Sequence, residues 1–183
     1  MKITILNGDM NPAAYGFSEY IYNLDKELSR SNSVERFDLL SMNLKYCTGC
    51  WSCWWKTPGQ CAIMDDGEII LKSVINSDFL IFASPLMSGF TSSELKKITD
   101  RFVSLLHPYV IILSGESHHR KRYAKYPDFG VILGKENDTD DEEIRIVSDI
   151  YDRLAINFHC TKKYLRTTDS YTIEDIAYET CNN

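Results

Sequence analysis

Short apolar runs alternate with segments of helical periodicity along the chain, and this alternation constrains the fold more than any other feature of the sequence. Residues 3–6 and 79–83 are almost entirely apolar, as expected for strands that are covered on both faces. Phe17, Ile21 and Leu24 recur at the spacing of one helix face. Strands that alternate with helices form a mostly parallel sheet, because right-handed crossovers lay each helix across it. The predicted strands are residues 3–6, 34–40, 79–83, 129–133 and 163–167, with a capping box at 139–142 and a terminal helix at 173–180.

Five strands in 183 residues suit an α/β fold with a doubly wound, flavodoxin-like parallel sheet in the order 2-1-3-4-5 and helices on both faces. The sequence has no internal repeat and no linker, so we expect one domain over residues 1–183. In this strand order a ligand crevice lies where the order reverses, at the carboxyl ends of the first and third strands. The loops after Leu6, Ala83 and Leu133 are therefore the candidate binding loops.

The charge and the apolar runs exclude several classes of partner. A net charge of -6 argues against nucleic acid and against anionic membrane surfaces, because both need clustered Lys and Arg. No apolar run approaches the roughly 20 residues of a membrane-spanning helix, and the N-terminal run is too short for a signal peptide. We therefore expect a cytoplasmic protein whose six cysteines are kept reduced.

The segment after the third predicted strand carries a family resemblance. Ser84, Pro85, Gly89, Ser92, Leu95, Lys96, Asp100 and Arg101 match the pattern S/T-P-x-Y-x-G-x-x-S-x-x-L-K-x-x-x-D-R. This segment resembles the NADPH-dependent FMN reductase family of flavodoxin-like proteins, in which the loop wraps the flavin ring. The resemblance implies an FMN site at Ser84, Pro85, Leu86, Met87, Ser88, Gly89 and Phe90, with Met87 in place of the usual Tyr.

The first loop, residues 7–16, departs from the same family. Its relatives carry G-S-P-R, whereas this chain reads Gly8-Asp9-Met10-Asn11 and has no Lys or Arg in the loop. A phosphate group there would depend on backbone N–H groups, on Ser18 and on the start of the following helix. The resemblance carries over Gly8 and Ser18 as cofactor-binding positions, and a plain surface loop is the alternative.

Four of the six cysteines lie within fifteen residues, inside a Cys- and Trp-rich loop at about 45–66. Cys47, Cys50 and Cys53 have C-x2-C-x2-C spacing, and Cys61 follows after seven residues. This set resembles the iron-sulfur flavoproteins, a branch of the same family, which implies a four-iron four-sulfur cluster on these four residues. Structural zinc, disulfides, and packed or redox-reactive thiols without a cluster are the alternatives.

Two further segments allow two interpretations each. All three tryptophans, Trp51, Trp54 and Trp55, lie among the cysteines, which favours an oligomer interface that also covers the flavin over a cap on the core. The basic segment at 118–125 could be an anion clamp for a flavin or NAD(P)H phosphate, or else a solvated loop or subunit contact.

The resemblance implies an FMN-binding oxidoreductase. Electrons would pass from NAD(P)H, or from a ferredoxin-like donor, through the flavin to a small acceptor such as a quinone or free flavin. We expect a homo-oligomer with no nucleic-acid or membrane partner. The alternative is an iron-sulfur flavoprotein that carries electrons without a substrate of its own.

Overall fold

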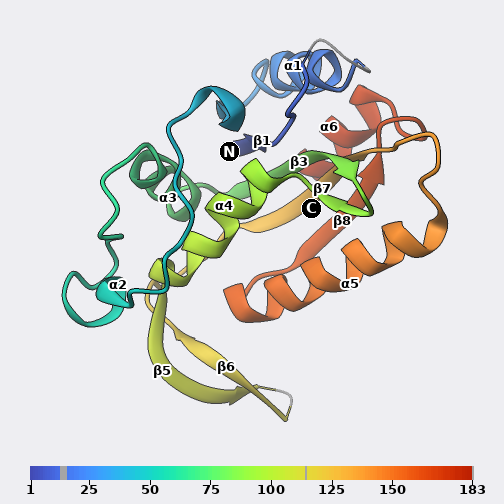
Figure 1. Ribbon diagram of the computed structural model, residues 1–183. Coiled ribbons are helices and arrows are strands. Elements are labelled where there is room, and N and C mark those ends of the chain that lie inside the picture. The colour runs from blue at the N-terminus through green and yellow to red at the C-terminus, as the bar shows by residue number, and fades with distance from the viewer. Residues whose placement is uncertain (13–15, 114, 183) are drawn as a thin grey trace.

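The central sheet has the strand order that the sequence predicts. The computed structural model describes residues 1–12, 16–113 and 115–182. Its parallel strands are β1 (Lys2–Asn7), β2 (Ser33–Asp38), β3 (Phe79–Met87), β7 (Asp128–Gly134) and β8 (Lys162–Thr167), in the order β2-β1-β3-β7-β8 (Figure 1). Counted along the parallel strands, this is 2-1-3-4-5, so the α/β, flavodoxin-like fold is confirmed.

Helices cover both faces of this sheet and bury two separate apolar clusters. On one face, α1 (Phe17–Leu28) and α6 (Ile173–Cys181) pack against Ile3, Ile5 and Ile81. On the other face, α3 (Gly67–Ile75), α4 (Ser93–Arg101) and α5 (Asp141–Phe158) pack against Leu6, Leu80 and Phe82. Successive side chains of β1 and β3 point to opposite faces, which explains why residues 3–6 and 79–83 are almost entirely apolar.

Two antiparallel pairings depart from the expected pattern. The strand expected to end at Ala83 continues to Met87 and turns back through Ser88 and Gly89 into β4 (Phe90–Thr91), because Ser84 and Pro85 still pair with the end of β7. The apolar and basic runs beyond α4 form a hairpin of β5 (Leu106–Leu113) and β6 (Glu116–Lys121), which projects away from the sheet (Figure 1). The basic segment expected to be a clamp, a loop or a subunit contact is therefore partly a strand, and its Arg120, Lys121 and Lys125 side chains are exposed.

The helix starts follow the predicted chemistry with one shift. The capping box expected at 139–142 lies one residue later, because Asp140 caps α5 by accepting the N–H of Glu143. The hydroxyl of Thr139 accepts the N–H of Glu136 and is used in the preceding turn.

The remaining short elements are η1 (Leu39–Ser41), α2 (Ser52–Trp55) and η2 (Phe102–Leu105). Among the residues described, none of the helices has the length and apolar character needed to cross a bilayer.

Candidate functional site

The loops after β1, β3 and β7 meet at the carboxyl edge of the sheet, as expected. The Gly8 N–H donates to the carbonyl of Ala83 at 2.8 Å, and a Cβ at Gly8 would lie 2.6 Å from Ser92 Oγ. This crowding explains the glycine, because the first loop must cross the start of α4 at close range. From the loop after β7, Glu136 accepts the N–H of Ser88 at 3.4 Å. The three predicted loops therefore form one edge of the molecule.

The motif serines after β3 shape the turn. The Ser84 hydroxyl accepts the N–H of Ser92 at 2.8 Å and donates to the Pro85 carbonyl. Ser92 in turn caps α4 by accepting the N–H of Leu95. Ser84 and Leu86 are each 1% exposed, so their role in this structure is to hold the β3–β4 turn.

The tip of the β3–β4 turn presents the groups that could flank a planar ring. Met87 is 41% exposed and Phe90 is half-buried against the core. Between them Ser88 and Gly89 have φ angles of 52° and 74°, which close a two-residue turn. A Cβ at Gly89 would lie 2.9 Å from Glu143 Oε1, so glycine lets the turn approach α5 closely. An exposed thioether and an aromatic ring beside this turn fit an aromatic ligand.

The first loop carries a buried carboxylate beside the start of α1. Asp9 is 5% exposed; its Oδ2 accepts the Ser18 hydroxyl at 2.6 Å and its Oδ1 accepts the Asn11 N–H at 2.9 Å. The predicted position Ser18 is thus engaged by Asp9, and residues 13–15 of this loop lie outside the described residues. A cavity of about 740 Å³ opens here, lined by Asn7, Asp9, Pro12, Ser18, Glu19, Tyr22, Arg36, Asp38, Leu40 and Ser41.

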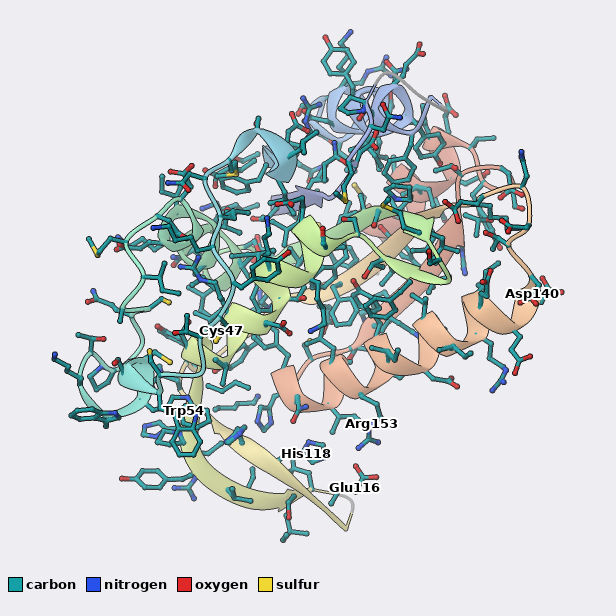
Figure 2. All side chains as sticks on the ribbon, viewed as in Figure 1. Cys47, Trp54, Glu116, His118, Asp140 and Arg153 are labelled. Atoms are coloured by element: carbon teal, nitrogen blue, oxygen red, sulfur yellow. The ribbon has the colours of Figure 1, made fainter. Side chains whose placement is uncertain are left out.

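The cysteine loop connects β2 to α3 and encloses a second cavity. Cys47, Cys50, Cys53 and Cys61 all line this space of about 370 Å³, together with Trp51, Trp54, Ile63, Asp100, Arg101, Val103 and Ser104. Figure 2 shows Cys47 and Trp54 close to one another near the base of the β5–β6 hairpin. All six cysteines are free thiols. The structure therefore brings together the four thiols that the sequence spacing grouped.

This cysteine cavity lies at the opposite end of α4 from the β3–β4 turn. Ser93 begins α4 near that turn, and Arg101 ends it in the wall of the cavity. Nine helical residues span about 13 Å, so the cavity and the turn are separated by about this distance.

The tryptophans lie at the cysteine cavity. The Trp54 indole donates to the Val103 carbonyl at 2.9 Å and its ring contacts His119, while Trp51 and Trp55 are exposed. Within one chain the tryptophans therefore lie at the cysteine cavity and beside the hairpin, and an oligomer interface that also covers the flavin stays a prediction.

The four thiols influence one another electrostatically. Burial raises the pKa of Cys53, and the charges of Cys61, Cys47 and Cys50 raise it further. Hydrogen bonds from the backbone and hydroxyl of Ser52 lower the pKa of exposed Cys50. In the described part of the chain, no three His, Cys, Asp or Glu side chains already have the arrangement that holds a metal ion. The four thiols are nevertheless a suitable donor set for an iron-sulfur cluster, since each one faces the same cavity.

A buried ion pair fixes the wall of the cysteine cavity. Arg101 Nη1 lies 2.7 Å from both carboxylate oxygens of Asp65, and the two side chains are 1% and 0% exposed. Asp65 also accepts the N–H groups of Lys45 and Gly67. Burial would raise the pKa of Asp65, but the hydrogen bonds and charge of Arg101 and these backbone donors hold the pKa below its usual value.

Sequence reasoning placed Arg101 in the family pattern but gave it no role. The two positions stand in recognisable patterns, the C-x3-D-D run from Cys61 to Asp66 and the Asp-Arg pair at the end of α4, but neither pattern shows that Asp65 and Arg101 pair. The guanidinium also lies near the carbonyls of Lys45 and Ile63, on the two arms of the cysteine loop. Its buried Nε has no hydrogen-bond partner among the described residues. The cavity wall thus contains a cationic side chain with one unused N–H donor.

The basic segment does not reach the crevice. His118 of β6 is buried between Asn157 of α5 and Glu116, and Glu116 also pairs with Arg153. Figure 2 shows His118, Glu116 and Arg153 together at the end of α5 opposite Asp140. About ten helical residues, or about 15 Å, separate this cluster from Glu143 beside the β3–β4 turn. The basic segment therefore lies away from the β3–β4 turn of its own chain, and an anion clamp for a flavin or NAD(P)H phosphate stays a prediction.

Sequence comparison finds relatives over part of the chain. Over 99 residues, 53% of this chain, it is 32% identical to an iron-sulfur flavoprotein from Archaeoglobus fulgidus. Over 104 residues, 55% of this chain, it is 33% identical to an iron-sulfur flavoprotein from Clostridioides difficile. These matches cover 44% and 45% of the relatives, so the chain spans less than half the length of the curated relatives it matches. No family model matches the chain.

Comparison of structures supports the fold. RosB, solved with bound 8-demethyl-8-formylriboflavin-5'-phosphate, superposes with a TM-score of 0.66 at 13% identity, covering 100% of this chain and 77% of RosB. An NAD(P)H:quinone oxidoreductase from Methanothermobacter marburgensis gives a TM-score of 0.62 at 15% identity, covering 91% of this chain and 82% of that protein. At these identities the likeness concerns the flavodoxin-like architecture.

Proposed function

We propose that this protein is a cytoplasmic, homo-oligomeric oxidoreductase that uses a bound flavin. The observation that carries the proposal is the meeting of three loops at the carboxyl edge of the sheet, where Met87 and Phe90 flank a two-residue turn. The partial similarity to iron-sulfur flavoproteins and the fold shared with a quinone oxidoreductase support it. Electrons come from NAD(P)H or a ferredoxin-like protein and leave to a small acceptor such as a quinone or free flavin.

In this proposal the chain positions a ring and the flavin supplies the redox chemistry. A bound flavin accepts a hydride and exchanges single electrons. Met87 and Phe90 would flank the ring of a bound flavin, and the positive φ angles at Ser88 and Gly89 close the turn that carries them. Ser84 and Ser92 hold that turn from beneath through the hydrogen bond between them. No side chain in this arrangement is required as a nucleophile.

Flavin retention by the β3–β4 turn tests the proposal. Met87→Asp places a charge against the ring and is expected to weaken flavin binding at least ten-fold, because a carboxylate loses hydration there without gaining a partner. Met64→Asp is the matched control, since Met64 is also exposed but lies in the cysteine loop. The measurement is a fluorescence titration of the purified apoprotein with riboflavin and FMN. If the wild-type protein retained neither flavin, or if both variants bound equally well, the proposal would be wrong.

A second candidate function is one-electron transfer through an iron-sulfur cluster on Cys47, Cys50, Cys53 and Cys61. The observation that favours it is the shared cavity that all four thiols line. Arg101, in the same wall, would offset part of the negative charge of four thiolates. A cluster would add a one-electron centre, and the protein could then act as a carrier without a substrate of its own.

Anaerobic reconstitution distinguishes this candidate from free thiols. The wild-type protein should take up about four iron and four sulfide per chain if a cluster forms. Cys53→Ser should lose that uptake, whereas Cys160→Ser should keep it, because Cys160 lies outside the cavity. Less than one iron per wild-type chain would remove the candidate.

A further inference from the structure

The part of the proposed flavin site that would receive the ribityl chain and its terminal group is lined by carboxylates. In flavodoxin-like folds the flavin lies at the switch point between the first and third parallel strands, and helix N-termini beside such crevices commonly receive phosphate groups. In this chain that position, beside the start of α1, is taken by the Asp9 carboxylate. Asp9 accepts the Ser18 hydroxyl and the Asn11 N–H, one on each oxygen. It therefore uses donors that a phosphate group would need.

The residues around Asp9 do not supply free cationic side chains that would neutralise a phosphate group placed beside its carboxylate. From residue 7 to residue 25 the sequence has no Lys or Arg. Of the described residues that line the adjoining cavity, Asp9, Glu19 and Asp38 carry carboxylates and Arg36 carries a cation. Arg36 is already paired with two carboxylates, Asp25 at 3.2 Å and Asp38 at 3.1 Å. A phosphate monoester, with a charge of about -1.5 to -2, would enter a region with excess negative charge.

The same carboxylate suits an uncharged polyol. An ionised carboxylate has about four acceptor positions, and Asp9 uses one on each oxygen, so it can accept further hydrogen bonds from hydroxyl groups. Hydroxyl groups donate readily to a carboxylate, and such charge-assisted hydrogen bonds are stronger than neutral ones. The hydroxyls of a ribityl chain provide these donors, whereas a terminal phosphate provides acceptors and negative charge.

We propose that Asp9 determines cofactor choice by excluding the 5'-phosphate, so that the crevice binds a flavin with an uncharged ribityl tail, such as riboflavin, in preference to FMN. The proposal rests on the flavin function proposed above and specifies which flavin that site accepts. It departs from the FMN that the resemblance in residues 84–101 implies. Asp9 acts here as a specificity-determining residue at the tail of the cofactor, far from the redox-active ring.

The test compares the affinities of two flavins for the full-length apoprotein. Riboflavin and FMN are titrated separately into wild-type, Asp9→Ser and Asp9→Asn proteins while flavin fluorescence is followed. Asp9→Ser removes the charge and offers a hydroxyl donor; Asp9→Asn removes the charge with little change of shape. Glu27→Gln, near the other end of α1, is the matched control because it also removes one negative charge but lies away from Asp9. Thermal melts establish that each variant is folded.

We expect wild-type protein to bind riboflavin at least ten-fold more tightly than FMN. Both Asp9 variants should raise the affinity for FMN by about ten-fold to one hundred-fold, as expected when a like charge is replaced by a neutral hydrogen-bonding group. Glu27→Gln should leave the ratio of the two dissociation constants unchanged.

The outcomes separate this inference from the function on which it rests. Wild-type protein that binds FMN more tightly than riboflavin, with no gain of FMN affinity in either Asp9 variant, would overturn the inference and leave the flavin function standing. Wild-type protein that binds neither flavin, with Asp9 variants that bind FMN, would overturn the assignment of riboflavin as the ligand. Failure of every protein to bind either flavin would remove the proposed function together with the inference.

Discussion

Removing the charge of Asp65 should destabilise the protein strongly. The change is Asp65→Asn, which preserves the shape of the side chain and leaves Arg101 buried without its counter-ion. Both side chains are at most 1% exposed, and two contacts of 2.7 Å join them. Breaking a buried ion pair of this kind costs about 3 to 5 kcal/mol of unfolding free energy. For a chain of 183 residues this corresponds to a melting temperature lower by roughly 6 to 20 °C.

Urea unfolding followed by circular dichroism measures this loss. The midpoint should fall while the m-value stays constant, because the surface exposed on unfolding does not change. Lys72→Met is the matched control: it breaks the exposed pair with Glu68, which should cost less than about 1 kcal/mol. The double variant Asp65→Asn with Arg101→Met should recover part of the stability, since no buried charge is then left alone. A loss below about 1 kcal/mol in Asp65→Asn would refute the assignment of this pair as a buried, mutually dependent unit.

Three further predictions concern acid stability, thiol reactivity and packing. The pKa of Asp65 is lowered in the folded state, so its contribution to the free energy of unfolding is present above the unfolded pKa of about 3.9 and is lost as the pH falls through the folded pKa. Urea midpoints measured from pH 6 down to pH 2 should therefore fall less steeply in Asp65→Asn than in the wild-type protein. Cys50 should react with iodoacetamide at neutral pH much faster than Cys160, because burial raises the pKa of Cys160 to about 12. Peptide mass spectrometry measures the two rates, and equal rates would contradict this reasoning. Gly8→Ala should lower the unfolding free energy by about 1 to 3 kcal/mol in the same urea assay, since its Cβ would lie 2.9 Å from Leu95 Cβ; an unchanged midpoint would contradict this.

The parallel sheet could be predicted from the sequence because its strands obey a local rule. Strands β1, β3 and β7 are buried on both faces, and each therefore contains a short apolar run, as in residues 79–83. Their order then follows from the handedness of the crossovers and from chain length. The meeting of the three loops could be predicted on the same basis.

The hairpin of β5 and β6 could not be predicted in this way. Tyr109, Val110 and Ile112 are apolar but exposed, and β6 is polar at every position, so neither strand shows the alternation of apolar and polar residues that predicts a half-buried strand. The pair depends instead on contacts distant in sequence, such as His118 with Asn157. Such contacts leave no periodic signal in the sequence.

The two buried charges at the cysteine cavity and the carboxylate at the start of α1 were also beyond sequence reasoning. Asp9, Asp65 and Arg101 are charged residues of types that are mostly found on the surface, and their burial depends on partners from separate elements. A pattern match could place Arg101 near a site but could not show that its partner follows Cys61 by four residues.

The ion pair between Asp65 and Arg101 also determines how freely the cysteine loop can change its length. Asp65 accepts the N–H of Lys45 and Asp66 accepts the N–H of Asn43, so both ends of the loop are fastened where it leaves and rejoins the domain. When the ends of a loop are fixed, doubling its length costs only about 0.6 kcal/mol of closure entropy. The seven residues between Cys53 and Cys61 can therefore be lengthened or shortened with little effect on the sheet. The spacing between Cys53 and Cys61 can therefore change to suit the group that occupies the cavity without a large change in the stability of the fold.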